Sequence, residues 1–297
     1  YIKVYGVLVG KKPLIFTNND SAYETALEFK KQGVEPIILD TREEQSSELI
    51  DAAKNQNIKI KFSHAVISAN GYKKVKSAQI GKLNNDKTGF ENTEKIECDC
   101  ICVSGFWTPT VHLASQSGNK LKFSDQIDAF IPDKSKQKET SIGASKGTFT
   151  LKETLEEGFK TGFEISKNIT NNENLTSTPN SNEAKKNSHD KFWCSPLPKG
   201  KNFKRFVDFQ NDVAVSDIEV ALREGYRSIE HVKRYTTLGM ATDQGRTSNL
   251  NGLQLVANVE KKIVPQVGHT TFRPPFTPIT IGTIVGREID MEYMPTR

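Results

Sequence analysis

The sequence has 297 residues, of which 35% are hydrophobic, and this length suffices for about two domains, each with its own core. It carries 41 Lys and Arg against 36 Asp and Glu, a formal net charge of +5, and these charges are scattered along the chain. Because a nucleic-acid-binding protein gathers its cations on one face, no nucleic-acid partner is expected.

The chain shows no targeting or membrane signal. No apolar run approaches the roughly 20 residues of a spanning helix, and no signal peptide opens the sequence. A cytoplasmic protein without membrane contact is therefore expected. The chain begins with Tyr1 rather than Met, a few residues before a predicted strand, so we expect an internal piece of a longer protein.

The first ninety residues predict alternating strands and helices. An apolar run at residues 14–17 is followed by turn residues and by Ser21-x-x-Glu24, a capping box for a helix. A second strand at 34–39 ends in Asp40, about 20 residues after the first turn, as in dinucleotide-binding units. The loop TNNDSAY lacks the glycines that let a backbone approach a pyrophosphate. We predict a Rossmann-like unit in which Asp40 is a turn residue at a strand end.

A hairpin and a cysteine-bearing strand follow. Residues 58–80 alternate in polarity, and Asn70-Gly71 is a hairpin signal. The next predicted strand, residues 98–104, carries three of the four cysteines on one face: Cys98, Cys100 and Cys102. Side chains on one face of a strand lie in a line about 6–7 Å apart, which is poor geometry for a tetrahedral metal. We therefore predict small buried hydrophobic residues rather than a metal site.

Two glycines precede a predicted helix in the middle of the chain. Residues 141–147 lead into a helix through Phe163. At this strand-to-helix transition Gly143 and Gly147 would let backbone N–H groups approach a phosphate or a ribose; a plain loop is the alternative. Residues 167–191 contain only three aliphatic residues, too few to bury a core, so a flexible linker is predicted.

From Arg205 onward the sequence predicts a compact module of three helices. Ser216 and Glu219 have the spacing of a capping box for the first of them. The predicted helix starts are Ser216, Ser228 and Ser248, and the predicted ends are Gly225, Gly239 and Val259.

Residues 230–252 gather cations, hydroxyls, amides and glycines with almost no apolar residues between them. Lys233 and Arg234 end the second helix, Gln244 lies in the turn, and the third helix points its free N–H groups back toward that turn. This convergence suits an anionic or heteroaromatic ligand, such as a flavin phosphate or the N1/O2 edge of a flavin ring. The alternative is that the cations cap helix carbonyls and the Thr and Asn side chains satisfy tight turns.

The stretch HVKRYTTLGMATDQGRTSN, with FVDFQNDV before it and TTFRPPFTPITIG after it, resembles the alpha subunits of heterotetrameric sarcosine oxidases. SGFWTPTVHLASQ, SDQIDAFIP and IFTNNDSAYETA resemble the same family, so the resemblance covers nearly the whole chain. It implies an α/β fold with a Rossmann-like two-dinucleotide-fold, disulfide-oxidoreductase-like region followed by a small helical ferredoxin-like domain. It also implies an internal fragment that lacks the N-terminal part and the C-terminal folate-binding domain.

The resemblance further implies cofactors and partners. This subunit would bind NAD, and covalently held FMN would lie at its interface with the beta subunit. The beta subunit would carry FAD, and the missing C-terminal domain would bind tetrahydrofolate. Gamma and delta subunits would complete the complex. The residues that match the family's NAD pocket are Gly143, Ala144, Phe149 and Leu151. Those that match its FMN contacts are Lys233, Arg234, Thr236, Thr237, Gln244, Thr247 and Ser248. No catalytic residue and no metal ligand is assigned to this chain.

The helical module also resembles ferredoxin-like domains that bind a [2Fe–2S] cluster through C-x-C and a later cysteine pair. The residues in register with those four cysteines are Asp208, Gln210, Leu238 and Asp243. Without thiolates no cluster is expected, and the domain is interpreted as a retained scaffold. His112 and His231 have no Cys or Ser partner nearby in the sequence, so a structural role is expected for both.

The sequence thus predicts five segments: a nested Rossmann-like domain (1–95), the return segment of the NAD-binding fold (96–166), a flexible linker (167–204), a small helical domain at the FMN and subunit interface (205–265) and a connector to the folate-binding domain (266–297). The resemblance implies one subunit of a flavin-dependent oxidoreductase that acts on the CH–NH group of sarcosine. The product is glycine, with formaldehyde or 5,10-methylenetetrahydrofolate and hydrogen peroxide. The alternatives are a subunit of a related flavin-dependent amino-acid or amine dehydrogenase, and a non-catalytic scaffold.

Overall fold

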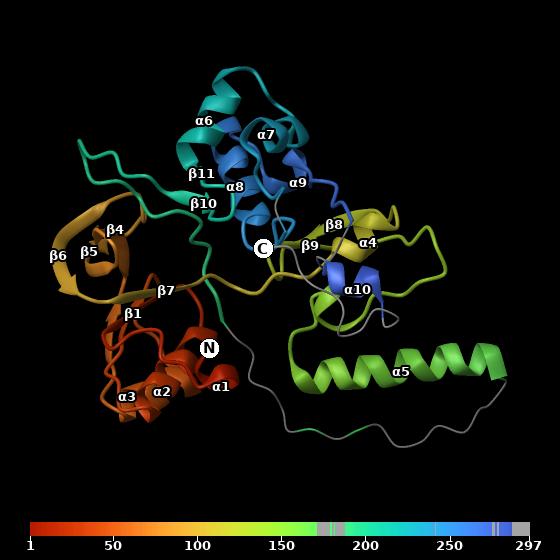
Figure 1. The fold of residues 1–297 in the computed structure, drawn as a ribbon, viewed down its shortest axis with the longest axis horizontal. Helices are drawn as coiled ribbons and strands as arrows, with labels where there is room; N and C mark the ends of the chain where they lie inside the picture. The colour runs from red at the N-terminus through yellow and green to blue at the C-terminus, as the bar shows by residue number, and fades with distance from the viewer. Residues whose placement is uncertain are drawn as a thin grey trace. The chain divides into compact units, whose positions relative to one another are not determined.

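The computed structural model describes residues 1–170, 179, 181, 188–240, 242–274, 277 and 279–286. The chain forms two compact units (Figure 1). Unit 1 comprises Tyr1–Trp107 and Ala184–Arg205, and unit 2 comprises Thr108–Glu183 and Phe206–Arg297. The finer division into five segments stays a prediction.

A four-stranded parallel sheet of order β3-β2-β1-β7 forms the centre of unit 1. Its strands are β1 (Pro13–Thr17), β2 (Ile37–Asp40), β3 (Lys59–Phe62) and β7 (Cys100–Ser104). Helices α2 (Ser21–Lys31) and α3 (Glu48–Asn55) connect the first three strands, and a short helix α1 (Ile2–Tyr5) precedes them. The order 3-2-1 is that of a doubly wound fold, so the predicted Rossmann-like unit is confirmed.

The sheet is covered on both faces. One face packs on α2 and α3 through a cluster that includes Ile15, Tyr23, Phe29, Ile38 and Ile50. The other face packs on an antiparallel sheet through Leu14, Leu39, Ala78, Ile80 and Cys98. This second sheet consists of β4 (His64–Gly71), β5 (Val75–Leu83) and β6 (Phe90–Glu97). The hairpin predicted at Asn70-Gly71 is confirmed, because Gly71 pairs with Val75.

Local details of unit 1 differ from the sequence predictions. The helix α2 is not started by a Ser21 capping box: Ser21 is already helical, and its N–H donates to Asn19 Oδ1 at 3.0 Å. Strand β7 starts only at Cys100, so alternation does not include Cys98. Cys98 packs with Leu14 while Cys102 packs on the helix-covered face, so the prediction of three cysteines on one face is wrong.

The two cysteines of the unit 1 core are expected to be unreactive. Burial raises the pKa of the Cys98 thiol and of the Cys102 thiol. Because alkylation proceeds through the thiolate, a raised pKa leaves less reactive thiolate at a given pH. We expect iodoacetamide at pH 8 to label both residues at least about tenfold more slowly in the folded protein than in urea. Peptide mass spectrometry measures the two rates; equal rates would contradict the packing.

Unit 2 contains a hairpin, a long helix and the predicted helical module (Figure 1). Its first part consists of α4 (His112–Gln116), β8 (Leu121–Ser124), β9 (Ala129–Pro132), a 3₁₀ turn (Gly143–Ser145) and α5 (Leu151–Thr170). Its second part consists of β10 (Phe206–Asp208), β11 (Val213–Ala214), α6 (Val215–Arg223), α7 (Ile229–Thr236), α8 (Asn249–Glu260), α9 (Val264–Val267) and α10 (Ile281–Val285). No helix in the described part of the chain is both long enough and apolar enough to cross a bilayer.

Helix boundaries in unit 2 correct several predictions. Helix α5 runs to Thr170 rather than Phe163, into the segment predicted as linker. Helix α6 is capped by Asp217, which accepts from Ala214 N at 2.8 Å, rather than by Ser216 and Glu219. Helix α7 ends before Thr237, whose φ of +65° terminates it two residues earlier than predicted.

The C-terminal part of the predicted linker is ordered within unit 1. His189 forms a β-bridge with Asn19, and Ser195 Oγ donates to Val66 O at 2.7 Å. The central linker residues 171–178, 180 and 182–187 lie outside the described residues.

Candidate functional site

The turn between α7 and α8 depends on close backbone packing. Gly239 and Gly245 have φ of +66° and +73°, values that L-residues with a side chain rarely adopt. A Cβ at either position would lie within 2.3 Å of the Asn249 side chain. The turn between the two helices therefore requires both glycines.

A buried carboxylate joins this turn to β10. Asp208 is 2% exposed. Its Oδ2 accepts from Gly239 N at 2.8 Å and from Ser248 Oγ at 3.4 Å. Its Oδ1 accepts from Gln210 N at 2.9 Å and from Asn211 N at 3.3 Å. Asp208 thus connects three segments, the end of β10, the turn after α7 and the start of α8.

The four positions in register with cluster cysteines come together in the structure. Beside Asp208, Gln210 Oε1 accepts from Thr242 Oγ1 at 3.2 Å and from Asp243 N at 3.3 Å. Leu238 is buried against Gly252 of α8. Hydrogen bonds and packing within the chain therefore connect the two loops at these positions. Across the described residues, no group of three or more His, Cys, Asp or Glu side chains has the arrangement of a metal site.

Lys233 is a buried cation at the end of α7. Its side chain contacts residues 269–273, where Nζ donates to Thr271 O at 3.3 Å. Burial lowers the pKa of Lys233, the nearby Glu230 carboxylate raises it, and Arg273 and Arg234 lower it further. Glu230 does not contact Lys233 as an ion pair; instead it accepts from Thr271 N at 2.5 Å and pairs with Arg234 at 3.2 Å.

The remaining predicted FMN contacts divide into exposed and internal groups. Arg234 and Thr237 are exposed, and so is Thr247, whose hydroxyl donates to Asp243 Oδ2 at 2.9 Å. The Thr236 hydroxyl donates to Val232 O at 2.8 Å, which satisfies a helix carbonyl. Ser248 is fully buried against Asp208, so its side chain supports the turn rather than facing a ligand.

Gln244 connects the turn to residues 269–273, which we call the strap. Gln244 has a φ of +49°, and its Oε1 accepts from Arg273 N at 3.3 Å. His112 contacts both segments: Nε2 is 3.1 Å from Gln244 O, and the ring packs on Phe272 at a tilt of 36° with centroids 4.0 Å apart. Burial lowers the pKa of His112, because the charged imidazolium is disfavoured away from water. His112 is 3% exposed and packs between the turn and the strap, as a residue with a structural role would.

The strap was not recognised in the sequence as part of the site. Its residues belong to segment 266–297, which is predicted as a connector to a folate-binding domain. Their role depends on contacts 29 to 41 residues away in sequence, between Arg273 and Gln244 and between Thr271 and Glu230. Local pattern carries no signal for such contacts.

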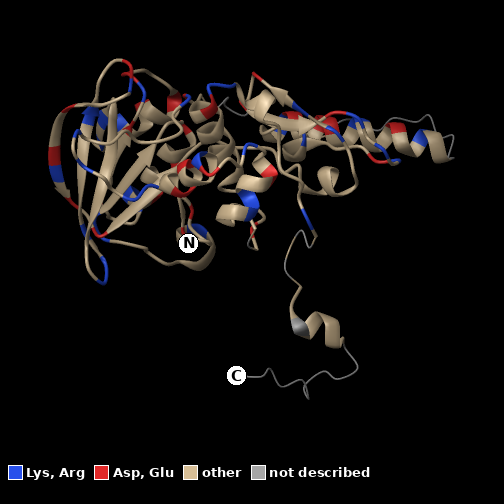
Figure 2. Cartoon of the chain, turned by 90° about the horizontal axis from the view of Figure 1, so that it is seen from above, with Lys and Arg blue, Asp and Glu red and all other residues tan. Residues whose placement is uncertain are grey.

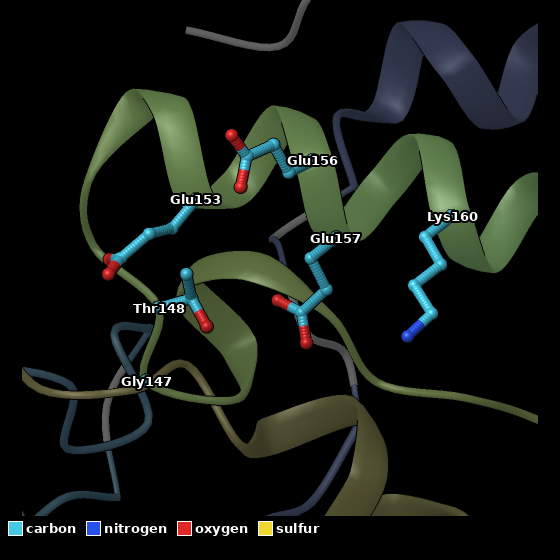
Figure 3. A pocket seen from close by; sticks show the side chains of 6 residues that line it. All are labelled: Gly147, Thr148, Glu153, Glu156, Glu157 and Lys160. Atoms are coloured by element: carbon cyan, nitrogen blue, oxygen red, sulfur yellow. The ribbon is translucent and has the colours of Figure 1, made fainter. Parts of the chain in front are cut away.

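The segment predicted to hold NAD lies beside a shallow open hollow. Figure 3 shows its lining residues, Gly147, Thr148, Glu153, Glu156, Glu157 and Lys160. The N–H of Gly143 does not point to free space but donates to Glu157 Oε2 at 2.8 Å. Although burial opposes it, the hydrogen bonds from Gly143 N and Lys146 lower the pKa of Glu157. The Glu157 carboxylate therefore binds the Gly143 N–H that was expected to approach a phosphate or a ribose.

Of the four NAD residues, Gly143 is thus engaged internally, and Ala144 lies in the 3₁₀ turn beside it. Phe149 is 38% exposed and Leu151, the first residue of α5, is 62% exposed. Three glutamates and one lysine line the hollow, and Glu157 also pairs with Lys146 at 3.0 Å. The other carboxylates disfavour a pyrophosphate, whereas carboxylates accept hydrogen bonds from ribose hydroxyls. These residues suit the hydroxyls of a ribose better than the phosphates of a nucleotide.

In unit 1 the acidic residue of the Rossmann-like unit is engaged in a buried ion-pair network. Asp40 is fully buried, and its Oδ2 lies 2.7 Å from Arg42 Nη2 and accepts from the Tyr23 hydroxyl at 2.7 Å. Arg42 Nη1 also pairs with Asp20 Oδ1 at 2.9 Å and donates to Ser188 O at 3.0 Å. Arg42 N donates to Asp40 Oδ1 at 3.0 Å, which confirms the predicted turn role. The Asp40 carboxylate is not available to a ribose.

Comparison with known proteins identifies the family. The sarcosine oxidase A3 domain family matches residues 202–287. Over 100% of its length the chain is 33% identical to sarcosine oxidase subunit alpha of Rhizobium meliloti (strain 1021), and over 97% it is 30% identical to that of Corynebacterium sp. (strain P-1). The chain belongs to the sarcosine oxidase alpha-subunit family. It spans 29% and 30% of the lengths of these two relatives.

A solved structure supports the fold. The crystal structure of L-proline dehydrogenase from P. horikoshii matches 96% of this chain and 52% of its own chain, with a TM-score of 0.61 at 16% identity. At this identity the likeness concerns the fold alone. It agrees with the parallel sheet of unit 1, so the α/β, Rossmann-like class predicted for this sarcosine oxidase alpha-subunit homologue is confirmed.

Charges in this alpha-subunit homologue are mixed rather than segregated. Figure 2 shows Lys and Arg next to Asp and Glu along both units. Many of them pair on the surface, as Lys12 does with Glu97 at 2.9 Å and Lys82 with Glu91 at 2.9 Å. The α7–α8 turn and the strap differ, because the cations Lys233, Arg234 and Arg273 act on one another electrostatically there, and Glu230 pairs with Arg234.

Proposed function

We propose that this chain is part of the alpha subunit of a sarcosine oxidase complex. The complex would oxidise sarcosine, with O2 and water, to glycine, formaldehyde and hydrogen peroxide, or pass the one-carbon unit to tetrahydrofolate. The supporting observation is the 33% identity to a sarcosine oxidase alpha subunit over the whole chain. Amine oxidation and FAD would belong to the beta subunit, with gamma and delta subunits completing the assembly.

The proposed role of this chain is to hold one side of FMN. When bound, FMN relays electrons from FAD to O2. Arg234, whose Nη1 is engaged by Glu230, offers its other guanidinium N–H groups at the surface. The hydroxyls of Thr237 and Thr247 are exposed but donate within the chain, to Thr236 O and Asp243 Oδ2, so they offer acceptor oxygens. Lys233 adds a buried positive charge near these residues, and the low dielectric of the protein interior strengthens its attraction for an anion. Gln244 and His112 fix the turn, so these groups stand in one arrangement before the cofactor arrives.

Removing the buried cation is expected to weaken flavin binding. In the full-length alpha subunit co-expressed with its partner subunits at limiting flavin, Lys233→Met should lower the FMN incorporated per complex at least about tenfold. FMN must bind here before it is attached covalently, and a charge-assisted attraction of about 1.5–3 kcal/mol is lost. Met keeps the buried stem, which preserves packing. Gln244→Ala should have a smaller effect because it only loosens the turn.

The absorbance spectrum of the purified complex measures this effect. Arg223→Ala, on the exposed end of α6, serves as the matched control and should leave flavin content unchanged. Equal FMN content and equal oxidase activity in Lys233→Met and wild type would refute the proposed FMN site, provided that thermal unfolding of both complexes agrees.

A non-catalytic scaffold is the second candidate function. Two groups that could bind a nucleotide are instead bound within the chain, which favours this function. Gly143 N donates to Glu157, and Asp40 pairs with Arg42. Denaturing the intact complex and assaying the released nucleotide separates the two candidates. NAD at about one per alpha subunit supports nucleotide binding, which we propose involves the ribose and base beside Phe149 and Leu151. If the complex releases no nucleotide, the alpha-subunit segment formed by this chain is a scaffold.

A further inference from the structure

The loop between β1 and α2 lies where a doubly wound fold binds its nucleotide. In the order β3-β2-β1-β7, successive strands depart to opposite sides of β1, so the boundary between β1 and β7 is a switch point, beyond whose carboxyl ends such sheets hold ligands. The Asn19 side chain crosses this boundary, because its Nδ2 donates to Ser104 O at 3.2 Å and also to Gly105 O. The switch point of unit 1 is therefore bridged by the chain itself.

A segment from the later part of the sequence covers this loop. Residues 188–195, which we call the plug, exchange backbone hydrogen bonds with it. Asp20 N donates to Ser188 O at 3.1 Å, and in the other direction Asp190 N donates to Asn18 O at 3.0 Å. Two side chains of the loop add to these bonds. Asn18 Nδ2 donates to Asp190 O at 2.7 Å, and Asp20 Oδ2 accepts from Ser188 N at 3.0 Å.

Aromatic contacts hold the rest of the plug. The His189 ring stacks on Phe106 with centroids 4.5 Å apart, and Trp193 packs edge-on against the same Phe106 ring at 5.1 Å. Phe192 packs edge-on against Phe16 of β1 at 6.2 Å. Because Phe106 contacts two of the three rings, and follows the end of β7 directly, it is the side chain on which the position of the plug depends most.

The plug makes a contact that a nucleotide makes in dinucleotide-binding units. There, a pyrophosphate accepts hydrogen bonds from backbone N–H groups at the start of the helix. Here Ser188 O accepts from Asp20 N at 3.1 Å and from Arg42 Nη1 at 3.0 Å. A neutral carbonyl suits this place better than a phosphate, because the Asp20 and Asp40 carboxylates share the guanidinium of Arg42. A further anion would add negative charge where two buried carboxylates already lie against one cation.

We propose that the plug replaces a nucleotide in unit 1. It satisfies the loop after β1, covers the switch point with aromatic rings and keeps dinucleotides from the carboxyl edge of the sheet. The segment that leads into the helical module then starts from a fixed point on unit 1 rather than from a free linker. This inference concerns unit 1 alone and does not depend on the proposed FMN site.

Trypsin cleavage after Lys191 measures how often the plug opens. Lys191 is exposed, but the backbone before it is held by the loop, so the rate of cleavage follows the fraction of molecules in which the plug is open. In the full-length alpha subunit assembled with its partner subunits, Phe106→Ala should speed this cleavage at least about tenfold, because two aromatic contacts are lost. Mass spectrometry of the new N-terminus at Phe192 gives the initial rate. Adding NAD or ADP at millimolar concentration should leave the wild-type rate unchanged.

Tyr72→Ala is the matched control, because Tyr72 lies in the same unit, is 94% exposed and should leave the rate unchanged. Asn18→Ala, which removes one hydrogen bond to the plug, should speed cleavage about fivefold. Wild-type cleavage as fast as that of Phe106→Ala would overturn the inference, and so would acceleration by either nucleotide, which would show that a nucleotide displaces the plug. Hydrogen exchange of the β2 amides should match the wild type in both variants. Faster β2 exchange in both would also overturn the inference, by assigning residues 188–195 to the core of unit 1.

Discussion

Replacing Arg42 by Met should lower the free energy of unfolding of unit 1 by about 3–5 kcal/mol, the usual cost of removing one partner from a buried ion pair. Arg42 is 5% exposed and lies between two buried carboxylates, those of Asp20 and Asp40. Met fills much of the same volume but leaves both carboxylates without a counter-charge. It also removes the hydrogen bond to Ser188 O.

Urea-dependent hydrogen exchange of the backbone amides in β1 and β2 measures this loss within unit 1, which a global unfolding curve of a two-unit chain does not resolve. Lys12→Met is the control: Lys12 pairs with Glu97 at 2.9 Å, but both side chains are mostly exposed, so a change of at most about 1 kcal/mol is expected. A loss below about 1 kcal/mol for Arg42→Met would show that water reaches the two carboxylates.

Replacing Asp208 by Ala should be the most damaging single change in the helical module. Its carboxylate accepts from three backbone N–H groups and one hydroxyl, and two of these donors, Gly239 N and Ser248 Oγ, are buried with it. An unsatisfied buried donor costs about 1–3 kcal/mol, so a loss of about 2–4 kcal/mol is expected. The turn that carries the proposed FMN contacts should become mobile together with α8.

Hydrogen exchange at the start of α8 and FMN uptake by the full complex together measure this effect. Asp208→Asn should be milder than Asp208→Ala because the amide oxygen still accepts from Gly239 N. Glu219→Ala, on the exposed face of α6, is the control and should change neither measurement. Faster exchange in α8 without any change in FMN uptake would contradict the proposal that this turn positions the flavin.

The alternating strands and helices of unit 1 could be predicted because their signals are local. Apolar runs at β1 and β2, turn residues between them and the period of α2 all lie within a few residues of each other. Strand β6 was missed because it has one face in solvent and a sequence rich in charge, FENTEKIE, so its alternation is weak. Pairing with β5 decides its conformation.

The composition of the α7–α8 turn likewise predicted a polar, glycine-dependent turn, and the structure contains one. What the sequence left open was whether each donor faces a ligand or the chain itself. Thr236, Thr237, Thr247 and Ser248 all carry hydroxyls that donate within the chain, yet only Thr237 and Thr247 are exposed. A side chain's partner depends on which remote segment packs beside it, and local spacing does not specify that.

Membership of the sarcosine oxidase alpha-subunit family, the alternating strands and helices of unit 1 and the position of the basic turn were determined by the sequence alone, since long motifs and short-range periodicity encode them. The tertiary structure decided the state of the charged groups. The charge of Asp40 is paired with Arg42, which also donates to the carbonyl of Ser188, 146 residues further along the chain. Lys233 is buried where its Nζ donates to Thr271 O. Burial and ion pairing depend on contacts between distant segments, because only folding removes water from between them.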